Sequence, residues 1–470
     1  MIASFFSTVS NFLWGWPMMI LLLGTHLFLT IRLRFPQRKI FTAIALSVKK
    51  DKNTQGDMSQ FGALATSLAA TIGTGNIIGV ATAIALGGPG AVFWCWITGV
   101  LGIATKYGEG LLAIRYRVIT ENGQMLGGPM YALERGLNMK WLAILFCIFT
   151  TIASFGIGNT VQVNAIASLL HETYHVSTSL TGGVITVLVG LVMLMGVKGI
   201  AKVCTTLVPF MALFYALSCI FILILNGSFV GDAIVLIGKS AFTPQAVGGG
   251  LVGSTVLMAA RFGIARGLFS NESGMGSAPI VAAAAQTRNP VRQALVSSTG
   301  TFWDTVVICA LTGLALVSSM LAYPEIAQLN GAQLTTAAFS KIPYAGTFML
   351  SLGIITFAFS TILGWSYYAE RAMEYLGGKA FIKPFRIAWV IVVYFGAIAN
   401  LETIWNAADC FNALMAIPNL ISLLLLSGVI VRDTHRYLWL DNLDRTDTSE
   451  IPQRVKREKK PFKTFFKKEK

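Results

Sequence analysis

Long apolar stretches recur along the whole chain, and short polar connectors separate them. Most stretches have about 20 residues, the length that crosses the hydrocarbon core of a bilayer as an α-helix. The pattern predicts an all-α polytopic membrane protein with about 11 transmembrane helices. The predicted spans are residues 9–31, 60–86, 90–113, 141–170, 179–197, 203–226, 248–270, 294–320, 347–369, 385–400 and 403–430.

The composition agrees with this interpretation. Of the 470 residues, 54% are hydrophobic and only 12% are charged, whereas soluble proteins carry about 25% charged residues. So little charge indicates that much apolar surface faces lipid. Six cysteines lie in apolar segments without a CxxC pair, which predicts free, buried thiols.

Basic residues occupy alternate connectors, which predicts the orientation of the chain. Lysines and arginines cluster in residues 32–52, 115–140, 198–202, 288–292 and 371–386, whereas residues 171–178, 321–340 and 400–402 contain none. Because cytoplasmic loops are enriched in Lys and Arg, we expect the N-terminus outside and the C-terminus in the cytoplasm. The first apolar stretch has no basic flank or cleavage site, so we expect it to remain as a span.

A basic segment ends the chain and accounts for much of its net charge of +15. The last twenty residues contain nine basic and two acidic side chains. We expect residues 433–470 to form a disordered cytoplasmic tail that touches anionic lipid. The tail lacks a folded aromatic platform, so a nucleic-acid partner is not favoured.

Two predicted spans are interrupted by glycine-rich strings. The second span contains Gly73-Thr74-Gly75-Asn76, and the seventh continues into a segment with Gly263, Gly267, Gly274 and Gly276. The two spans lie five crossings apart, so they run in opposite directions. This spacing predicts an inverted repeat of five helices plus five after one extra span. The expected units are residues 1–59, 60–230, 231–432 and 433–470.

An interrupted helix in lipid needs a substitute for its lost hydrogen bonds, because each unpaired backbone group costs several kcal/mol. A bound cation can take up freed carbonyls, and a bound carboxylate can take up freed amides. Interrupted spans at matching places in two halves therefore point to a transporter binding site. The alternative is that the glycines only allow close helix packing. A dinucleotide site is disfavoured because residue 78 is Ile where glycine is required.

The string His171-Glu172-Thr173-Tyr174-His175 matches the H-E-x-x-H pattern of zinc proteases. His26 and His435 are the other histidines, and the predicted topology places His435 on the opposite side of the membrane. The motif also falls where a span ends. We interpret it as a chance match, with an intramembrane zinc protease as the alternative.

Several longer strings resemble the alanine or glycine:cation symporter family, which comprises sodium-coupled amino-acid carriers of bacteria. The resemblance covers about residues 10–430 and departs at Ser273, where the family usually has alanine. It rests on "GTGNIIGVATAIALGGPGAVFW" (73–94), "TKYGEGLLAIRYR" (105–117), "GGPMYALERGL" (127–137) and "ARGLFSNESGMGSAPI" (265–280).

The resemblance implies a leucine-transporter-type fold in which residues 73–76 are the unwound part of the first core helix. The amides of Thr74 and Gly75 would then face a substrate carboxylate. The sodium site would consist of the carbonyls of Ala69 and Ile72 and the hydroxyls of Ser360 and Thr361. Oxygen ligands suit a hard cation. The alternative for the two hydroxyls is a bond to the preceding helical turn.

The resemblance also implies that Gln162 lies beside the substrate amino group, the alternative being a hydrogen bond between helices. Phe262, Gly263 and Trp365 are candidates for the pocket wall. A small pocket walled by aromatic residues would favour alanine or glycine. Na⁺ is the expected coupling ion, and we expect no organic cofactor.

Charged residues inside predicted spans are expensive and often functional. Lys106 and Glu109 lie one turn apart and could neutralise each other. Asp304 could serve an ion site, a proton site or a gate, with Arg261 or Arg266 as its partner. We also expect Glu272 to pair with Arg266.

The sequence therefore predicts a secondary active symporter in the bacterial inner membrane, which imports a small neutral amino acid with Na⁺. A carrier of the same fold for another small solute, or one coupled to protons, is the nearest alternative. A channel is a further one. The expected partners are the amino acid and the lipid bilayer.

Overall fold

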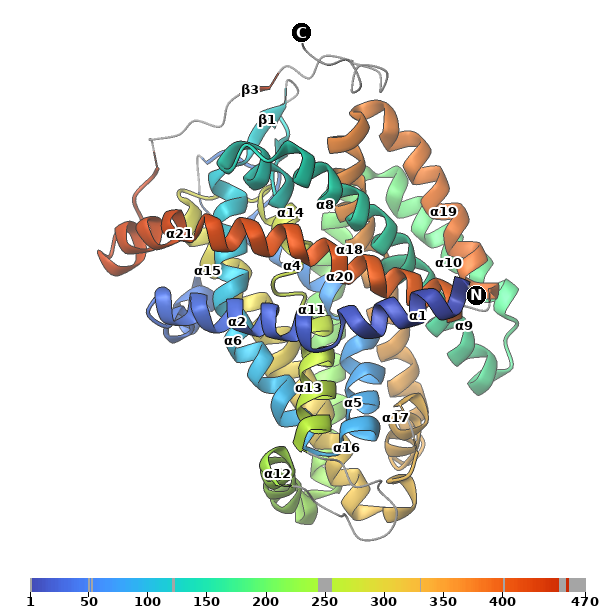
Figure 1. Ribbon diagram of the computed structural model, residues 1–470. Helices are drawn as coiled ribbons and strands as arrows, with labels where there is room; N and C mark the ends of the chain where they lie inside the picture. Colours follow the sequence, from blue (N-terminus) through green and yellow to red (C-terminus); the bar gives the residue numbers. More distant parts are fainter. Residues whose placement is uncertain are drawn as a thin grey trace.

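The computed structural model describes residues 2–49, 51, 54–120, 123–243, 256–329, 331–399, 402–447 and 454–455. The chain forms one bundle of helices (Figure 1). The first half contains α1 (Ile2–Leu13), α2 (Trp16–Arg32), η1 (Pro36–Lys39), α3 (Ile40–Ser47), α4 (Gln60–Thr71), η2 (Gly75–Gly79), α5 (Val80–Gly87), α6 (Gly90–Arg115), β1 (Val118–Thr120), β2 (Met125–Leu126), α7 (Pro129–Tyr131), η3 (Ala132–Gly136), α8 (Lys140–Ala153), η4 (Ser154–Thr160), α9 (Val161–Tyr174), α10 (Thr178–Leu194), α11 (Gly196–Leu225) and α12 (Gly227–Phe242).

The second half is also helical and ends in a short strand. It contains α13 (Val256–Asn271), α14 (Ala278–Ala282), α15 (Pro290–Thr301), η5 (Phe302–Cys309), α16 (Ala310–Ala322), η6 (Pro324–Ile326), α17 (Gly331–Ser340), α18 (Gly346–Gly377), η7 (Lys379–Phe381), α19 (Ile382–Ile398), α20 (Glu402–Leu425), α21 (Ser427–Thr434), η8 (His435–Trp439) and β3 (Arg454–Val455).

Several of these helices have the length and composition of membrane spans. Within the described residues, seven helices can cross a membrane, and the bent pair α4–α5 is an eighth candidate. The helix α10 is apolar but shorter, and α6 carries the buried charges Lys106 and Glu109. The polytopic helical class is therefore confirmed, whereas the count of eleven spans stays a prediction.

The second predicted span is interrupted where the sequence indicated. Its two halves, Gln60–Thr71 and Gly75–Gly87, meet at an angle of 55°. At the break, Ile72 has extended backbone angles, with φ −75° and ψ 91°. The helix resumes at Gly75 in a π-helical turn. A wider turn of this kind is frequent at functional sites.

The seventh predicted span breaks later than the glycine pattern suggested. Residues 248–255 lie outside the described residues, and α13 then runs unbroken to Asn271. The non-helical segment is 272–277, where Gly274 and Gly276 have φ of +89° and +87°. Gly263 lies inside α13, where a Cβ atom would come within 2.3 Å of the Ala91 carbonyl oxygen on α6. This glycine therefore allows close helix packing.

Three predicted loops contain helices. The predicted loop at residues 198–202 is part of α11, and Lys198 and Lys202 lie on exposed positions of that helix. The actual connection is a tight turn, in which the left-handed Gly196 (φ +68°) joins α10 to α11. The connector after residue 226 contains α12, and the connector 321–340 contains η6 and the whole of α17. In Figure 1, α12 and α17 lie at one end of the bundle and the β1 strand at the other.

A folded cap covers the end of the bundle near β1. Arg117 donates hydrogen bonds to the carbonyl oxygens of Ala283 and Ala285 at 3.2 and 2.8 Å. Burial lowers the pKa of Arg117 to about 10, and the charge of Asp57 opposes that shift. The cap therefore ties the connector after α6 to the segment after α14.

The C-terminal segment is ordered further than the expected boundary at residue 433. Arg115 forms ion pairs with Asp433 and Asp447 at 3.6 and 3.2 Å. Arg292 pairs with Asp444 at 2.6 Å, and β3 pairs in parallel with β1. These acidic residues, which precede the basic run, hold the chain against the bundle. The remaining tail residues, 448–453 and 456–470, lie outside the described residues.

All six cysteines are free and buried, as predicted. The tyrosines and tryptophans of the core are buried in the same way, with Trp365 and Trp389 nearly inaccessible. The interior is therefore closely packed around the interrupted helices.

A buried ion cluster fixes the end of α18. Arg371 bonds to Glu370 at 2.7 Å and to Glu374 at 2.5 Å. Arg386 of α19 adds two bonds to Glu370, at 2.6 and 2.9 Å. Arg371 is only 5% exposed, so its charge compensates carboxylates that water hardly reaches.

We expect Arg371→Met to destabilise the fold by about 3–5 kcal/mol, the scale of breaking a buried ion pair from one side. The purified protein should lose its helical circular dichroism at a lower temperature than the wild type. Lys383→Met, on an exposed position of α19, is the matched control and should unfold like the wild type. Equal melting of both variants would contradict the structural role of the cluster.

Candidate functional site

The break between α4 and α5 releases backbone carbonyls from the helix. The Gly73 amide donates to the Asn76 side-chain Oδ1 at 2.9 Å, so it no longer serves the carbonyl of Ala69, its partner in a regular helix. The Asn76 amide bonds to the Gly73 oxygen at 3.2 Å, which likewise leaves the Ile72 carbonyl without its helical partner.

A buried carboxylate on η5 holds Asn76 in place. The Asn76 side-chain amide donates to Asp304 Oδ1 at 2.7 Å. Asp304 Oδ2 accepts from Ser270 at 2.9 Å and from Thr305 at 2.6 Å. These contacts fix the amide orientation that lets Asn76 accept from Gly73. Asp304 is therefore bonded to these side chains rather than to Arg261 or Arg266, the partners expected from the sequence.

Two hydroxyl groups of α18 face the released carbonyls. Ser360 Oγ lies 3.1 Å from the Ala69 oxygen, and Thr361 Oγ1 lies 3.5 Å from the Ile72 oxygen. Both hydroxyls also lie 2.9 Å from the carbonyl oxygen of Phe357 on their own helix. The structure thus brings together all four residues expected at the sodium site.

The hydroxyl protons of Ser360 and Thr361 are fewer than the carbonyl oxygens around them that could accept a hydrogen bond. Each hydroxyl has one proton and two carbonyls within reach. When both donate to Phe357, the oxygens of Ser360 and Thr361 face those of Ala69 and Ile72 without a hydrogen between them. A hard cation with ligands at about 2.4 Å separates neighbouring ligands of a six-coordinate shell by about 3.4 Å. The residues present therefore fit Na⁺.

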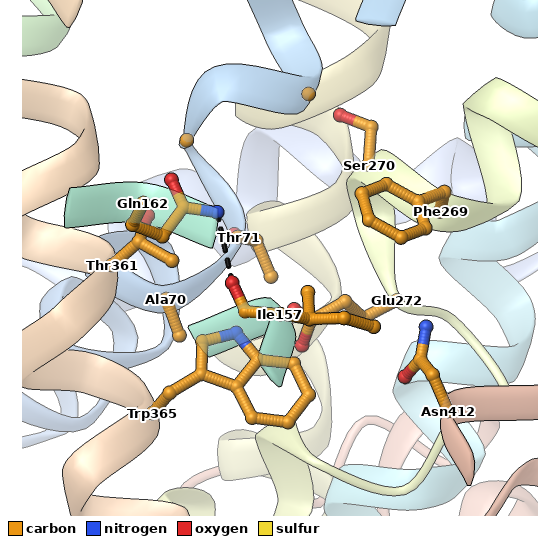
Figure 2. Close-up of a pocket in the computed structure, with 12 residues that line it drawn as sticks. Ala70, Thr71, Ile157, Gln162, Phe269, Ser270, Glu272, Thr361, Trp365 and Asn412 are labelled. Carbon is orange, nitrogen blue, oxygen red and sulfur yellow. Dashed lines mark hydrogen bonds between the residues drawn. The ribbon is translucent and has the colours of Figure 1, made fainter. Parts of the chain in front are cut away.

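A pocket lies beside these oxygens and is shown in Figure 2. Gln162 of α9 projects toward it, and its amide donates to the Ile157 carbonyl at 3.0 Å. Thr74 donates to Gln162 Oε1 at 3.2 Å. Twelve residues line the pocket: Ala70, Thr71, Gly73, Gly75, Ile157, Gln162, Phe269, Ser270, Glu272, Thr361, Trp365 and Asn412.

The pocket contains four of the eight residues expected to bind substrate, namely Gly73, Gly75, Gln162 and Trp365. Thr74 and Asn76 do not line the pocket, but they form hydrogen bonds to Gln162 and Gly73, which do. Phe262 and Gly263 do not line it, because they lie about two turns before the end of α13. The aromatic residue that α13 contributes is Phe269. Glu272 and Asn412 also line the pocket, and no pattern in the sequence predicted them there.

The second break, between α13 and α14, is held by a carboxylate from another helix. Glu109 Oε1 of α6 accepts the amides of Gly274 and Gly276 at 3.1 and 3.0 Å. The Asn419 side chain of α20 donates to the same oxygen at 2.7 Å and to the Gly274 carbonyl at 2.9 Å. Glu109 thus replaces the helical partners that the break removes.

Other charged residues differ from expectation. Lys106 Nζ has no hydrogen-bond partner within the described residues, so Lys106 and Glu109 form no direct bond. Glu272 accepts a hydrogen bond from Ser277 rather than pairing with Arg266. Arg266 lies over the ring of Phe269, at 6.0 Å from its centroid. The predicted pairs Lys106–Glu109 and Arg266–Glu272 are therefore not formed.

The H-E-x-x-H string lies at the end of α9. His175 caps this helix in a left-handed conformation with φ +57°, and both His171 and His175 are exposed. Over the parts of the chain that the structure describes, no group of three His, Cys, Asp or Glu side chains could hold a metal ion. The geometry gives no support to a zinc site here.

Known proteins resemble this chain over most of its length. A model of the sodium:alanine symporter family matches residues 1–450. The chain is 49% identical over 442 residues to the sodium/alanine symporter AgcS of Methanococcus maripaludis, covering 92% of this chain and 97% of that protein. It is 50% identical to an uncharacterised transporter of Haemophilus influenzae, covering 96% and 99%.

A solved structure confirms the predicted fold. The crystal structure of MhsT in complex with L-phenylalanine matches 84% of this chain and 94% of that one, with a TM-score of 0.59 at 14% identity. MhsT has the leucine-transporter-type fold. The predicted architecture of this chain is therefore correct at the level of its fold.

The two glycines at the first break provide a matched pair of variants. A Cβ on Gly73 would lie 2.7 Å from Thr361 Oγ1, whereas one on Gly75 would meet Phe269 at an ordinary 3.6 Å. We expect Na⁺ to raise the unfolding temperature of the wild type and of Gly75→Ala, because a ligand at 100 times its Kd adds about 2.7 kcal/mol. Gly73→Ala should lose this response. Equal responses of both variants to NaCl over choline chloride would place Na⁺ elsewhere.

Proposed function

Since this chain belongs to the sodium:alanine symporter family, we propose that it is a secondary active carrier that imports a small neutral amino acid, alanine or glycine, together with Na⁺. The supporting observation is the interruption of α4–α5 beside a pocket. There, freed carbonyls and two hydroxyls gather on one side, and the start of the π-helical turn at Gly75 lies on the other.

In this proposal, the released carbonyls of Ala69 and Ile72 and the hydroxyls of Ser360 and Thr361 hold the ion. The amides of Thr74 and Gly75 receive the substrate carboxylate at the positive end of the helix that follows. Both ligands then stabilise the same unwound segment. Each raises the affinity of the other, because coupling between two sites is reciprocal.

The pocket walls suit a small substrate. Trp365 packs directly on Gly158, where a Cβ atom would lie 2.3 Å from the Trp365 Cβ. With Phe269 on the other side, two aromatic rings bound the space. We infer that alanine and glycine fit this pocket better than branched or aromatic amino acids do.

We further propose that the carrier lies in the bacterial inner membrane with its N-terminus outside and its C-terminus in the cytoplasm. The alternation of basic connectors supports this orientation. Two repeats, residues 60–230 and 231–432, would then contribute one interrupted helix each.

The decisive experiment is uptake of labelled alanine into proteoliposomes. An inward Na⁺ gradient should drive accumulation, and replacing Na⁺ with choline should abolish it. Unlabelled alanine and glycine should compete, whereas phenylalanine, a nucleobase and a sugar should not. Undiminished uptake without Na⁺ would reject sodium coupling, and competition only by another solute would reject the amino acid.

The same assay separates transport from zinc chemistry. Glu172→Ala should leave uptake unchanged, because Glu172 is exposed at the end of α9. Loss of function in this variant, together with stoichiometric zinc in the purified protein, would favour a metalloprotease.

Thr361→Val tests the ion site with nearly constant side-chain volume. Losing the hydroxyl should raise the Na⁺ concentration for half-maximal uptake by about 10-fold or more, the scale of a lost hydrogen bond to a charged group. Thr356→Val, which removes a hydroxyl bonded only within α18, is the control and should keep the wild-type value. An unchanged Na⁺ requirement in Thr361→Val would argue against this site.

A further inference from the structure

A carboxylate that no helix partner neutralises faces the pocket. Glu272 lines the cavity from the break after α13, and in Figure 2 its side chain points inward, toward Ile157. It is only 5% exposed. Within the described residues its one hydrogen bond is from Ser277 to Oε2, at 2.5 Å. The other oxygen, Oε1, is therefore available to a ligand.

The backbone at Glu272 is held in an uncommon conformation. Its φ is +53°, a left-handed value that favours glycine and costs other residues about 1 kcal/mol or more. The conformation persists because Glu109 and Asn419 bind the following turn.

The buried charges around this break are unequal in number. Lys106 is 1% exposed, and its positive charge acts on Glu109, Glu272 and Asp304. Glu109 already receives three hydrogen bonds at one oxygen. One ammonium is thus present for three carboxylates, and Glu272, which accepts the fewest hydrogen bonds of the three, is the one that lines the cavity. Buried charges are normally paired, so this pocket attracts a cationic group.

The two walls of the pocket together match a zwitterion. One wall presents the cation site and the backbone of residues 73–75, which suit a carboxylate. Glu272 on another wall suits an ammonium group. In an α-amino acid, the ammonium group and the carboxylate are attached to the same carbon atom. We propose that Glu272 recognises the α-ammonium group of the substrate, and this inference rests on the proposed function. Glu272 then determines specificity for amino acids over monocarboxylates.

Glu272→Gln removes the charge while keeping the shape. Binding of labelled alanine should weaken by about 100-fold or more, the scale of removing one partner from a buried charged pair. The ratio of alanine affinity to lactate affinity should fall toward one. Asp304→Asn, a buried carboxylate outside the pocket, should keep that ratio even if alanine binds less well. A ratio unchanged in Glu272→Gln would overturn the inference.

Two further measurements keep the outcome clear. If wild-type protein shows no Na⁺-dependent alanine uptake, the proposed function fails; if uptake is normal and Glu272→Gln retains wild-type selectivity, only this inference fails. Should the variant not fold, a hydrophobic carbodiimide can be added to wild-type protein, since it adds to buried carboxyl groups. Mass spectrometry should show that alanine, but not lactate, slows labelling at Glu272. Equal labelling with and without alanine would refute the assignment.

Discussion

Backbone groups that leave a helix inside a membrane must find new partners, because lipid offers none. The structure meets this requirement at two places. At the first break, the side chain of Asn76 takes the Gly73 amide, and Asp304 orients Asn76. Asn76 thus satisfies the freed amide of Gly73. The carbonyls of Ala69 and Ile72 are left without their helical partners, on the side that faces α18. In the proposed function, these free carbonyls are what binds the ion.

The second break is satisfied by a charge instead of a neutral amide. Glu109 binds two backbone amides of the turn at Gly274–Gly276, and a buried charge is held without strong penalty only when such donors surround it. Lys106 adds a positive charge near this carboxylate. The two interrupted helices thus present different electrostatic environments to one cavity, which is a suitable arrangement for a molecule that carries both signs of charge.

Much of this could be predicted from the sequence, and the failures have physical causes. The string at residues 73–76 combines four poor helix formers, two of them glycines, in an apolar run, so the first break was predictable. Gly263 resembles part of a break but lies where α13 crosses α6 closely, and sequence alone does not separate these two uses of glycine. Glu272, from the break after α13, and Asn412, from α20, lie far apart in the chain, so only the fold brings them together. The acidic residues Asp444 and Asp447 pair with arginines of other segments, which no local pattern reveals.

The burial of every native thiol has a practical consequence. Since all six cysteines are packed inside the bundle, a single cysteine placed on the ends of α12 or α17 would be the readily accessible site for a spin label or fluorophore. Pairs of such labels would report the separation of helices during a transport cycle without prior removal of the natural residues. Distances between labelled helices can therefore be measured by spectroscopy on the protein in a lipid environment.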